Sequence, residues 1–334
     1  MVIANIIERA HSQSIEHIKF LRTRVNDVLR PYCEKENFPY ISRIKSLESI
    51  SDKVETGRYK SWNDLDDLFA ATIIIPNLNK ESEVIKFLKI NFDMTNIKKR
   101  GSTLKSPETF SFNSTRFIGK LKQTYAIDPQ LLKLNFEVQI KTAFEYAWAI
   151  ATHSFTYKTN KIEWNKLRLS AQLMASVEQL DMLINGSEDV CKHITKHKWA
   201  QIEYKTKILN FFTDLVKKKM IPEESIPSNL NRFSDNILNL LGYDYNNPKY
   251  NSKPIDEMLS KIEEKINSCN NESIFPRSIS LFQFILGVTL TNEIFNANSD
   301  KYTLLITDDL EKIFPEIKKI SKKFKRFNNS DKNI

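Results

Sequence analysis

Residues 133–158, KLNFEVQIKTAFEYAWAIATHSFTYK, change from one hydrophobic period to another. Apolar and polar residues alternate in LNFEVQI, which predicts a strand with an apolar face and with Glu137 on its polar face. From Ala143 the apolar residues recur at i, i+3, i+4 and i+7, the period of an amphipathic helix. Thr142 and Glu145 have the spacing of a capping box at the start of that helix. We therefore expect a strand that holds Glu137 at the edge of a cleft, with an ordinary solvated glutamate as the alternative.

The residues before this junction alternate between helical and strand patterns. Residues 4–36 keep an apolar period near 3.6 residues, in which Ser14 is the one polar interruption. Residues 69–75 are apolar and β-branched, which predicts a buried central strand. We expect further helices and strands over residues 43–57, 80–91, 92–99, 110–121 and 161–184. The last of these is a helix whose apolar face comprises Leu167, Ala171, Met174, Val177, Leu180 and Ile184.

The order of these elements predicts an α+β fold with a mixed β-sheet flanked by helices, followed by an all-α region. With 334 residues, of which 41% are hydrophobic and 27% charged, the chain has the length and composition of two globular domains. We expect a first domain at 40–187, with the helix of residues 1–39 packed on it, and a helical C-terminal region at 188–334. The segment NGSEDVCK at 185–192 is the expected boundary.

The composition excludes several classes of protein. Only 6 glycines are present and neither GxGxxG nor GxxxxGK[ST] occurs, so a glycine-rich phosphate-binding loop is not expected. The 3 cysteines lie far apart, which fits a reducing compartment better than a disulfide framework. No signal peptide is recognisable, and the longest apolar run, residues 284–290, is too short to cross a membrane. We therefore expect a soluble, cytoplasmic protein with no membrane partner.

The net charge of +9 favours polyanionic partners such as nucleotides, RNA or DNA. A lysine-rich surface that is merely solvated is the alternative.

A cationic group forms the first set of candidate site residues. On a helix, positions 45, 49 and 53 are successive i+4 neighbours, so Lys45, Ser49 and Lys53 form one polar stripe, with Arg43 within a turn of it. Several cations and a hydroxyl on one face suit a triphosphate, whose charge needs distributed donors. A solvated basic helix face is the alternative.

Carboxylates near strand ends form the second set. Asp66 and Asp67 precede the strand expected at 69–75, and Glu137 shares the polar face of its strand with Gln139. If Asp67 and Glu137 lie on neighbouring strands, they would share one Mg²⁺ and polarise an attacking hydroxyl. Aspartate is also common in turns that enter strands, so turn chemistry is the alternative for Asp67.

Two further patterns carry polar side chains. Phe112, Ser114 and Arg116 alternate along the expected strand at 110–121, so they face one way and would stack on a base and hold a phosphate. A core position is the alternative for Phe112. The other pattern consists of Cys191, His193 and His197, whose spacing resembles that of metal ligands. Because it supplies only three ligands, a zinc site is disfavoured.

Five segments of the chain, in the same order, resemble the RelA/SpoT-type nucleotide pyrophosphokinase domain, the synthetase half of the alarmone enzymes. They are RIKSLESISDK, LDDLFAATIII, FSFNSTRF, FEVQIKT and AFEYAWAIATHSFTYK, within residues 40–160. LRLSAQLMASVEQLDMLI resembles the helix that usually follows. The resemblance implies a nucleotidyltransferase-like fold and an enzyme in which ATP donates its β,γ-pyrophosphate to a ribose hydroxyl.

The resemblance also implies a role for each candidate residue. Asp67 matches the Mg²⁺-binding aspartate of the family, and Glu137 matches the carboxylate that activates the hydroxyl and helps to hold the metal. The family positions that hold ATP and its phosphates are matched by Arg43, Lys45, Ser49 and Lys53. The acceptor side of the site is matched by Phe112, Ser114 and Arg116. Signature positions near the acceptor, or in the interior of the fold, are matched by Gln139, Lys141 and His153.

Three residues depart from the family pattern. Thr72 stands where the family commonly has an arginine near ATP. Phe112 replaces a tyrosine that stacks on the base of the acceptor, and Arg116 replaces a histidine. Neither a His-Asp hydrolase half nor the regulatory C-terminal domains of the long alarmone enzymes are recognisable, so the chain resembles a small synthetase.

The expected activity is that of a GTP diphosphokinase, which uses GDP or GTP as acceptor and makes a (p)ppGpp-type alarmone of the stringent response. One alternative is a toxic small synthetase that modifies the 3′ end of tRNA or adenine nucleotides, in a toxin–antitoxin or phage-defence system. Another is a catalytically degenerate sensor that binds nucleotide or RNA.

The region at 188–334 would regulate or inhibit the synthetase, act as a fused antitoxin, or bind tRNA. Its basic segment at 318–327 suits RNA contact, with a solvated helix end as the alternative. A separate antitoxin or a second copy of the chain is the expected protein partner.

Overall fold

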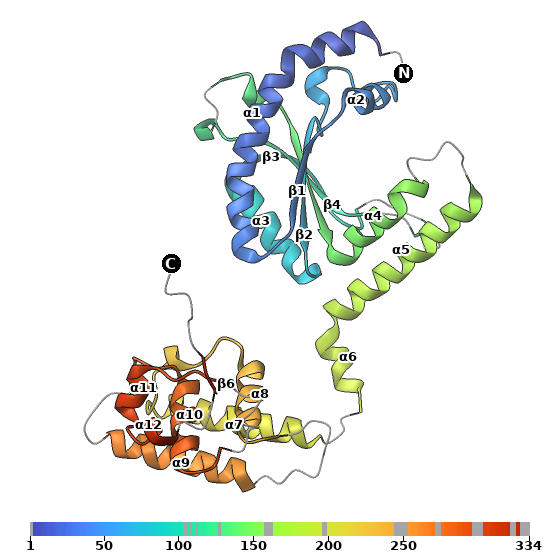
Figure 1. Cartoon of the computed structure of the whole chain (residues 1–334). Coiled ribbons are helices and arrows are strands. Elements are labelled where there is room, and N and C mark those ends of the chain that lie inside the picture. The colour runs from blue at the N-terminus through green and yellow to red at the C-terminus, as the bar shows by residue number, and fades with distance from the viewer. Residues whose placement is uncertain are drawn as a thin grey trace. The chain divides into compact units, whose positions relative to one another are not determined.

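The computed structural model describes residues 3–102, 106, 109–110, 113–125, 128–156, 163–195, 199–243, 253–270, 275–295, 303–320 and 325–327. The chain forms two compact units, Met1–Ile194 and Thr195–Ile334 (Figure 1). The first unit contains α6 (Ser187–His193), which the sequence assigns to the C-terminal region. The domain division made from the sequence stays a prediction.

A five-stranded mixed sheet forms the centre of the first unit. The strands are ordered β1-β2-β5-β4-β3; β2 and β5 are parallel, and the other neighbours are antiparallel. This sheet and the helices around it confirm the α+β class. The strands span Tyr40–Ile44 (β1), Phe69–Ile75 (β2), Phe92–Lys98 (β3), Thr115–Leu121 (β4) and Phe136–Thr142 (β5).

The helix predicted over 43–57 is wrong in its first part. Arg43 lies on β1, which pairs with β2, and Lys45 follows that strand; the helix is α2 (Leu47–Val54). Pairing with β2 satisfies the backbone of this segment, and its aromatic and β-branched residues suit a strand. The predicted helical stripe therefore keeps only two of its members on α2, Ser49 and Lys53.

Helices cover both faces of the sheet (Figure 1). α1 (Asn5–Glu36) and α3 (Glu81–Asn91) lie against one face, whereas α4 (Ala143–Thr156) and α5 (Trp164–Asn185) lie on the other side. Alternate strand residues point under α1 and α3 and form an apolar core. Its fully buried side chains include Ile18, Leu21, Phe69, Phe92, Phe117 and Phe136.

Short 3₁₀ helices lie in the connections of this unit. η1 (Trp62–Asp64) lies four residues before β2, and η4 (Leu131–Lys133) lies two residues before β5. Two others are η2 (Leu78–Lys80) and η3 (Gln123–Tyr125). Because β2 and β5 are parallel neighbours, both strands begin at the same end of the sheet, and η1 and η4 precede them there.

The capping box predicted between β5 and α4 is confirmed. The backbone N–H of Thr142 donates to Oε2 of Glu145 at 2.9 Å, and the backbone N–H of Glu145 donates to Oγ1 of Thr142 at 3.1 Å. Thr142 Oγ1 also donates to Oδ2 of Asp181 on α5 at 2.8 Å, so the start of α4 is tied to the helix beside it.

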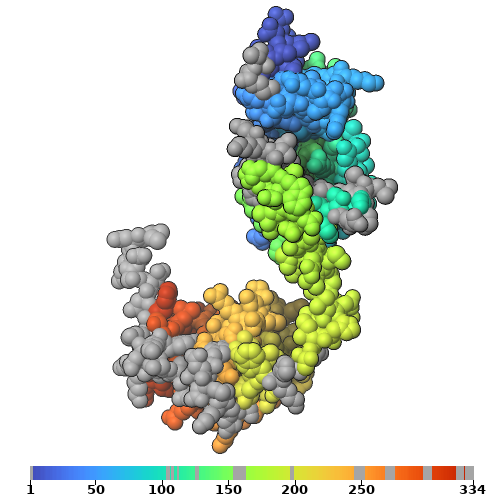
Figure 2. All heavy atoms as spheres, turned by 90° about the vertical axis from the view of Figure 1, so that its right-hand side faces the viewer, coloured from blue at the N-terminus to red at the C-terminus, as the bar shows by residue number. Residues whose placement is uncertain are grey.

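The apolar face predicted for α5 is buried only in part. The side that packs on α4 consists of Ser170, Met174, Val177 and Asp181, which recur at helical spacing. Other members of the predicted face are exposed, namely Leu167, Leu180 and Ile184. Figure 2 shows the surface of α5 in yellow-green. α5 therefore presents an apolar surface to solvent within the first unit.

The second unit is mainly helical, as predicted. Its core includes Phe212, Leu238, Ile262, Phe284 and Phe314. Two short strands also pair in parallel within the region at 188–334, where only helices were expected. Its elements are α7 (Ala200–Lys217), η5 (Glu223–Ser225), α8 (Leu230–Leu240), α9 (Lys253–Asn270), α10 (Leu281–Thr291), β6 (Thr303–Leu304), α11 (Asp308–Ile313), α12 (Ile317–Ile320) and β7 (Lys325–Arg326).

None of the helices in the described part of the chain has the length and apolar character needed to cross a membrane.

Candidate functional site

Strand register brings the predicted site residues into two rows across the face of the sheet on the α4 side. In the first row, Arg43 of β1 pairs with Ala70 of β2, which pairs with Glu137 of β5. Two residues further along each strand, the second row consists of Ile41, Thr72, Gln139 and Arg116. Because residues two apart on a strand share a face, both rows point to the same side of the sheet.

A cavity of about 410 Å³ lies over these rows. Its walls come from β1, β2, β5 and α4: Ile41, Ser42, Arg43, Ala70, Thr72, Gln139, Lys141, Tyr146, Ala149 and Ile150. The side chains change in character along β1, from exposed Ile41 to cationic Arg43. Ile150 of α4 is also exposed, so apolar surface lines part of the cavity opposite the strands.

Lysines and aspartates meet where β1 ends and β2 begins. Lys45 Nζ donates to Oδ2 of Asp67 at 2.7 Å, and Lys53 Nζ donates to Oδ1 of Asp67 at 2.8 Å and to Oδ1 of Asp66 at 2.6 Å. Lys53 also lies 4.8 Å from the ring centre of Tyr59. This arrangement brings together the two predicted lysines and the predicted metal-binding aspartate.

Burial and hydrogen bonding shift the pKa values of Asp67 and Lys53 in opposite directions. Burial alone would raise the pKa of Asp67, but the hydrogen bonds from Lys45 and Lys53 outweigh it and lower the pKa. Burial alone would lower the pKa of Lys53, but its hydrogen bonds to Asp66 and Asp67 outweigh it and raise the pKa. Asp67 and Lys53 therefore keep their charges at neutral pH.

Glu137 is buried, with 5% of its surface exposed. Gln139 Nε2 donates to Oε1 of Glu137 at 2.5 Å, so the glutamine orients the carboxylate. Lys141 lies two residues beyond Gln139 on the same face of β5. Burial, together with repulsion from Arg116 and Arg43, lowers the pKa of Lys141 to about 8, although Glu137 opposes the shift. An anion bound here would restore the charge of Lys141.

The remaining predicted residues are placed in three ways. Ser49 is exposed on α2, one turn before Lys53. Ser114 is buried just before β4, and its Oγ has no hydrogen-bond partner within the described residues. Phe112 lies outside the described residues, and His153 belongs to α4 with its side chain outside them.

The oxygen donors of Asp67 and Glu137 fit Mg²⁺, which prefers carboxylates and phosphate oxygens. No cluster of three or more His, Cys, Asp or Glu side chains suited to a metal occurs among the described residues. The protein would thus supply few of the ligands, and a bound triphosphate would supply the others.

The zinc-like pattern predicted from the sequence is only partly described. Cys191 is exposed, His193 is on α6, and His197 lies outside the described residues.

Several residues of the cavity were not predicted from the sequence. Tyr146, Ala149 and Ile150 line it from α4, at i, i+3 and i+4. That spacing marks a second face of the helix, beside the apolar stripe, and would have revealed them. The ion pair of Arg100 with buried Glu145 was also missed, because no local pattern joins a loop residue to a helix so far along the chain.

The protein-family model described as "Region found in RelA / SpoT proteins" matches residues 42–162. A search of curated proteins finds no match to this chain.

Several solved structures are similar to the chain. The small alarmone synthetase 2 from Bacillus subtilis is 20% identical, with a TM-score of 0.44, over 55% of this chain and 98% of that one. A GTP pyrophosphokinase family protein from Streptococcus pneumoniae is 18% identical, with a TM-score of 0.42, over 56% of this chain and 96% of that one. The small alarmone synthetase 1 from B. subtilis bound to its product pppGpp is 17% identical, with a TM-score of 0.42, over 55% and 97%.

The family match includes Arg43, Lys45, Asp67 and Glu137, and it confirms the resemblance seen in the sequence. Residues 42–162 of this chain are thus similar to the region found in RelA/SpoT proteins, and the rest of its length lies outside that family match.

Proposed function

We propose that the protein is an ATP-dependent pyrophosphokinase. The observation that carries the proposal is the meeting of Lys45, Lys53 and Asp67 beside the row that joins Arg43 to Glu137. Cations for a triphosphate, a carboxylate for a metal and a buried carboxylate for a proton are the groups that pyrophosphoryl transfer needs. The family match of residues 42–162 supports the same reaction class.

The change in side-chain character along β1 orients ATP in the 410 Å³ cavity. The adenine lies at the apolar end, between Ile41 and Ile150, with Thr72 at its edge. The phosphates extend past Arg43 toward Lys45 and Lys53. Successive residues on one face of a strand are about 6.6 Å apart, so the spacing of the two rows suits the length of an extended nucleotide.

The chain's own residues provide positioning and proton transfer. The hydroxyl oxygen of the acceptor attacks the β-phosphorus, the bond from that phosphorus to the α-phosphate oxygen breaks, and AMP leaves. Glu137, oriented by Gln139, accepts the proton of the hydroxyl. Asp67 and Glu137 would hold Mg²⁺. When bound, it would offset the charge on the transferred phosphates.

The acceptor is a guanine nucleotide, GDP or GTP, in this proposal, and the product is a (p)ppGpp-type alarmone. Arg116 lies beside Gln139 in the second row and would hold a phosphate of the acceptor. The buried Oγ of Ser114, which has no partner among the described residues, offers a further hydrogen bond.

A tRNA 3′ end or an adenine nucleotide is the second candidate acceptor, as in a toxic synthetase. The specific observation that favours it is Arg116 at the acceptor side, because a guanidinium binds the phosphates of a polynucleotide as well as those of GDP. A degenerate sensor is disfavoured, because a pure binder needs neither the metal carboxylate nor a buried base.

The test is an acceptor screen with the full chain. Purified protein, ATP labelled in the γ-phosphate and Mg²⁺ are incubated with GDP, GTP, AMP or tRNA, and labelled products are separated. We expect the label in a guanine nucleotide. If only tRNA or AMP is labelled, the guanine acceptor is rejected, but the assignment as a pyrophosphokinase stands. No labelled product with any acceptor would contradict the proposed function.

A further inference from the structure

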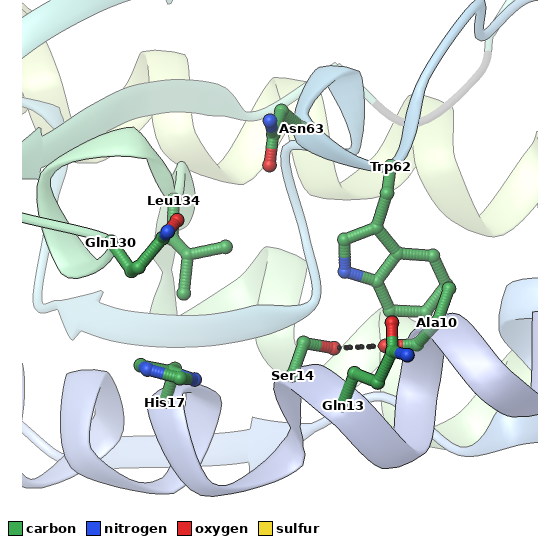
Figure 3. A pocket seen from close by; sticks show the side chains of 8 residues that line it. All are labelled: Ala10, Gln13, Ser14, His17, Trp62, Asn63, Gln130 and Leu134. Carbon is green, nitrogen blue, oxygen red and sulfur yellow. Dashed lines mark hydrogen bonds between the residues drawn. The ribbon is translucent and has the colours of Figure 1, made fainter.

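A second cavity lies against α1, which covers the sheet face opposite α4 (Figure 3). Its volume is about 380 Å³, within the size range of small-molecule sites. Its walls come from α1, η1 and the segment around η4: Ala10, Gln13, Ser14, His17, Trp62, Asn63, Gln130 and Leu134.

This cavity explains the polar interruption in the apolar stripe of α1. Ile18, Leu21 and Val25 are fully buried, and Ser14 lies one turn before Ile18 on the same stripe. Its Oγ donates to the carbonyl oxygen of Ala10 at 2.7 Å (Figure 3). A large apolar side chain at this position would extend the core into the space that the cavity occupies.

The lining of the cavity is polar and carries almost no charge. No Lys, Arg, Asp or Glu is among the lining residues that the structure describes. His17, the one titratable residue among them, is held through Nε2 by Oδ2 of Asp128 at 3.0 Å. The backbone N–H of Gln130 donates to the other oxygen of Asp128, which ties α1 to the segment before η4. This cavity therefore differs from the candidate active site, which is rich in cations.

Trp62 offers an unused donor. Its Nε1 is buried and has no hydrogen-bond partner within the described residues. Figure 3 shows this nitrogen on the side of the ring that faces Leu134, across the cavity. A buried donor without a partner costs about 1–3 kcal/mol, which an acceptor atom of a ligand would recover.

These groups favour an uncharged heteroaromatic ligand. The amides of Gln13, Asn63 and Gln130 each supply donors and an acceptor, as the edge of a nucleobase requires. Trp62 and Leu134 supply apolar surface for the faces of a ring. Neither Lys nor Arg occurs among the described lining residues, which disfavours a phosphate and favours a nucleoside over a nucleotide.

Two segments that line the cavity lead along the chain to the carboxylates of the candidate active site. Trp62 and Asn63 belong to η1, which leads into Asp67, and Leu134 precedes the strand that carries Glu137. Asn135 Nδ2 donates to the carbonyl oxygen of Asn63 at 3.1 Å and joins the two segments. A ligand that bridges η1 and η4 would hold the entrances of β2 and β5 in one arrangement.

We propose that this cavity is an effector site for an uncharged nucleoside, which stabilises the arrangement of Asp67 and Glu137. Binding at the cavity is independent of the function proposed above, whereas its effect on turnover rests on that function. Because binding restricts η1 and η4 before the substrates arrive, we expect the nucleoside to increase kcat.

Binding is tested on the full chain labelled with fluorotryptophan, by fluorine NMR. Trp62→Phe assigns the Trp62 signal among those of the 4 tryptophans. We expect adenosine or guanosine to shift that signal, and AMP to shift it at least about tenfold more weakly, because a phosphate meets no cation in this cavity. No shift with adenosine, guanosine, cytidine or uridine at millimolar concentration would overturn the proposal, as would equal affinity for AMP.

Two serines of α1 give a matched pair of variants. Ser14→Leu fills the cavity, whereas Ser12→Leu changes an exposed serine that bonds the carbonyl of Glu8 in the same way, at 2.9 Å. Ser14→Leu should abolish the shift and Ser12→Leu should keep it, with thermal unfolding of both variants checked first. A shift that persists in folded Ser14→Leu would place the ligand elsewhere and overturn the proposal. If Ser14→Leu does not fold, Gln13→Ala and Asn63→Ala replace it, and each should weaken binding at least about fivefold.

The effect on turnover is measured with the acceptor that the screen identifies. We expect saturating nucleoside to raise kcat about fivefold in the wild type and in Ser12→Leu, but not in Ser14→Leu. If the nucleoside shifts the Trp62 signal but kcat of the wild type is unchanged, the effector role is overturned and only the binding site stands. If no acceptor is modified at all, the proposed function fails, and the NMR result still decides whether the nucleoside site exists.

Discussion

The ammonium group of Lys45 donates a 2.7 Å hydrogen bond to Oδ2 of Asp67, at the point where β1 ends and β2 begins. Both side chains are mostly buried, with 14% and 18% of their surface exposed, so water screens the pair weakly. Lys53 holds the other oxygen of Asp67. The carboxylate thus keeps two cations in place before any phosphate arrives.

We expect Lys45→Met to lower kcat/KM by about 10²-fold, because it removes a cation placed for the phosphates of ATP. The fold should lose about 1–3 kcal/mol, since Lys53 still balances Asp67. Steady-state kinetics with ATP as the varied substrate and denaturant unfolding measure the two effects. Lys80→Met is the control, because Lys80 pairs with Glu83 at 2.8 Å on the surface of the same unit. Equal loss of activity in both variants would contradict a role for Lys45 in binding ATP.

Glu137→Gln tests the proton acceptor with little change in shape. Gln139 still meets an oxygen at that position, so the fold should persist. We expect kcat to fall about 10²–10⁴-fold, as for the loss of a general base. Single-turnover kinetics with labelled ATP measure the chemical step. Glu83→Gln, at a half-exposed carboxylate of α3, should retain wild-type kcat. Turnover in Glu137→Gln close to that of the wild type would reject the assignment.

The low pKa of Lys141 predicts proton uptake when a nucleotide binds. In the free protein burial lowers this pKa to about 8, so Lys141 is largely neutral at about pH 8.5; a bound phosphate would raise the pKa and restore the charge. We expect uptake of protons at about pH 8.5 and almost none below about pH 7, where Lys141 is charged with or without ligand.

Calorimetry in buffers of different ionisation enthalpy measures this uptake. Lys141→Met should bind nucleotide more weakly and show no pH-dependent uptake. Uptake that is the same in Lys141→Met and in the wild type would assign the proton to another group.

The capping box at the start of α4 predicts a large loss of stability for Thr142→Val. Valine keeps the shape of threonine but removes the cap of Glu145 and the hydrogen bond to Asp181. We expect a loss of about 2–4 kcal/mol, since a cap contributes about 1 kcal/mol and an unsatisfied buried acceptor costs about 1–3 kcal/mol. Denaturant unfolding measures the loss.

The same variant should be sensitive to pH. Burial raises the pKa of Asp181, and the hydrogen bond from Thr142 opposes that shift. Without this bond the folded pKa rises further. The difference in stability between Thr142→Val and wild type should therefore shrink as the pH falls and Asp181 takes up a proton. Ser176→Ala, at an exposed serine of α5, is the control and should change stability by less than about 0.5 kcal/mol. A constant difference at every pH would exclude Asp181 as the cause.

Local patterns predicted much of the first unit. The period of α1, the apolar run of β2 and the junction of β5 with α4 each carry their signal within one segment, and the structure contains all three. β1 was mistaken for the start of a helix because it is a short edge strand. Its pairing with β2 depends on residues far along the chain, which no local period reveals.

Which residues belong to the site could be predicted from the sequence, but their arrangement in space could not. That Lys45 and Lys53 hold Asp67 follows from the register of β1 on β2, and the row from Arg43 to Glu137 follows from the parallel pairing of β2 with β5. Side-chain periodicity cannot supply either register. The cavity was missed for the same reason, since its walls come from four elements that meet only in the folded chain.

The apolar end of the 410 Å³ cavity predicts a selective effect of Ile150→Ala on ATP. Ile150 is 60% exposed, so its truncation should cost the fold little. If the adenine covers this side chain, the loss of about 1–2 kcal/mol of apolar contact raises the KM for ATP about 5–30-fold, with kcat unchanged. Ile90→Ala is a matched control, because Ile90 is also 60% exposed on a helix of the same unit. Steady-state kinetics with ATP as the varied substrate separate the two parameters. An increase in KM for the acceptor alone would move the adenine away from Ile150 and reverse the orientation of ATP along β1.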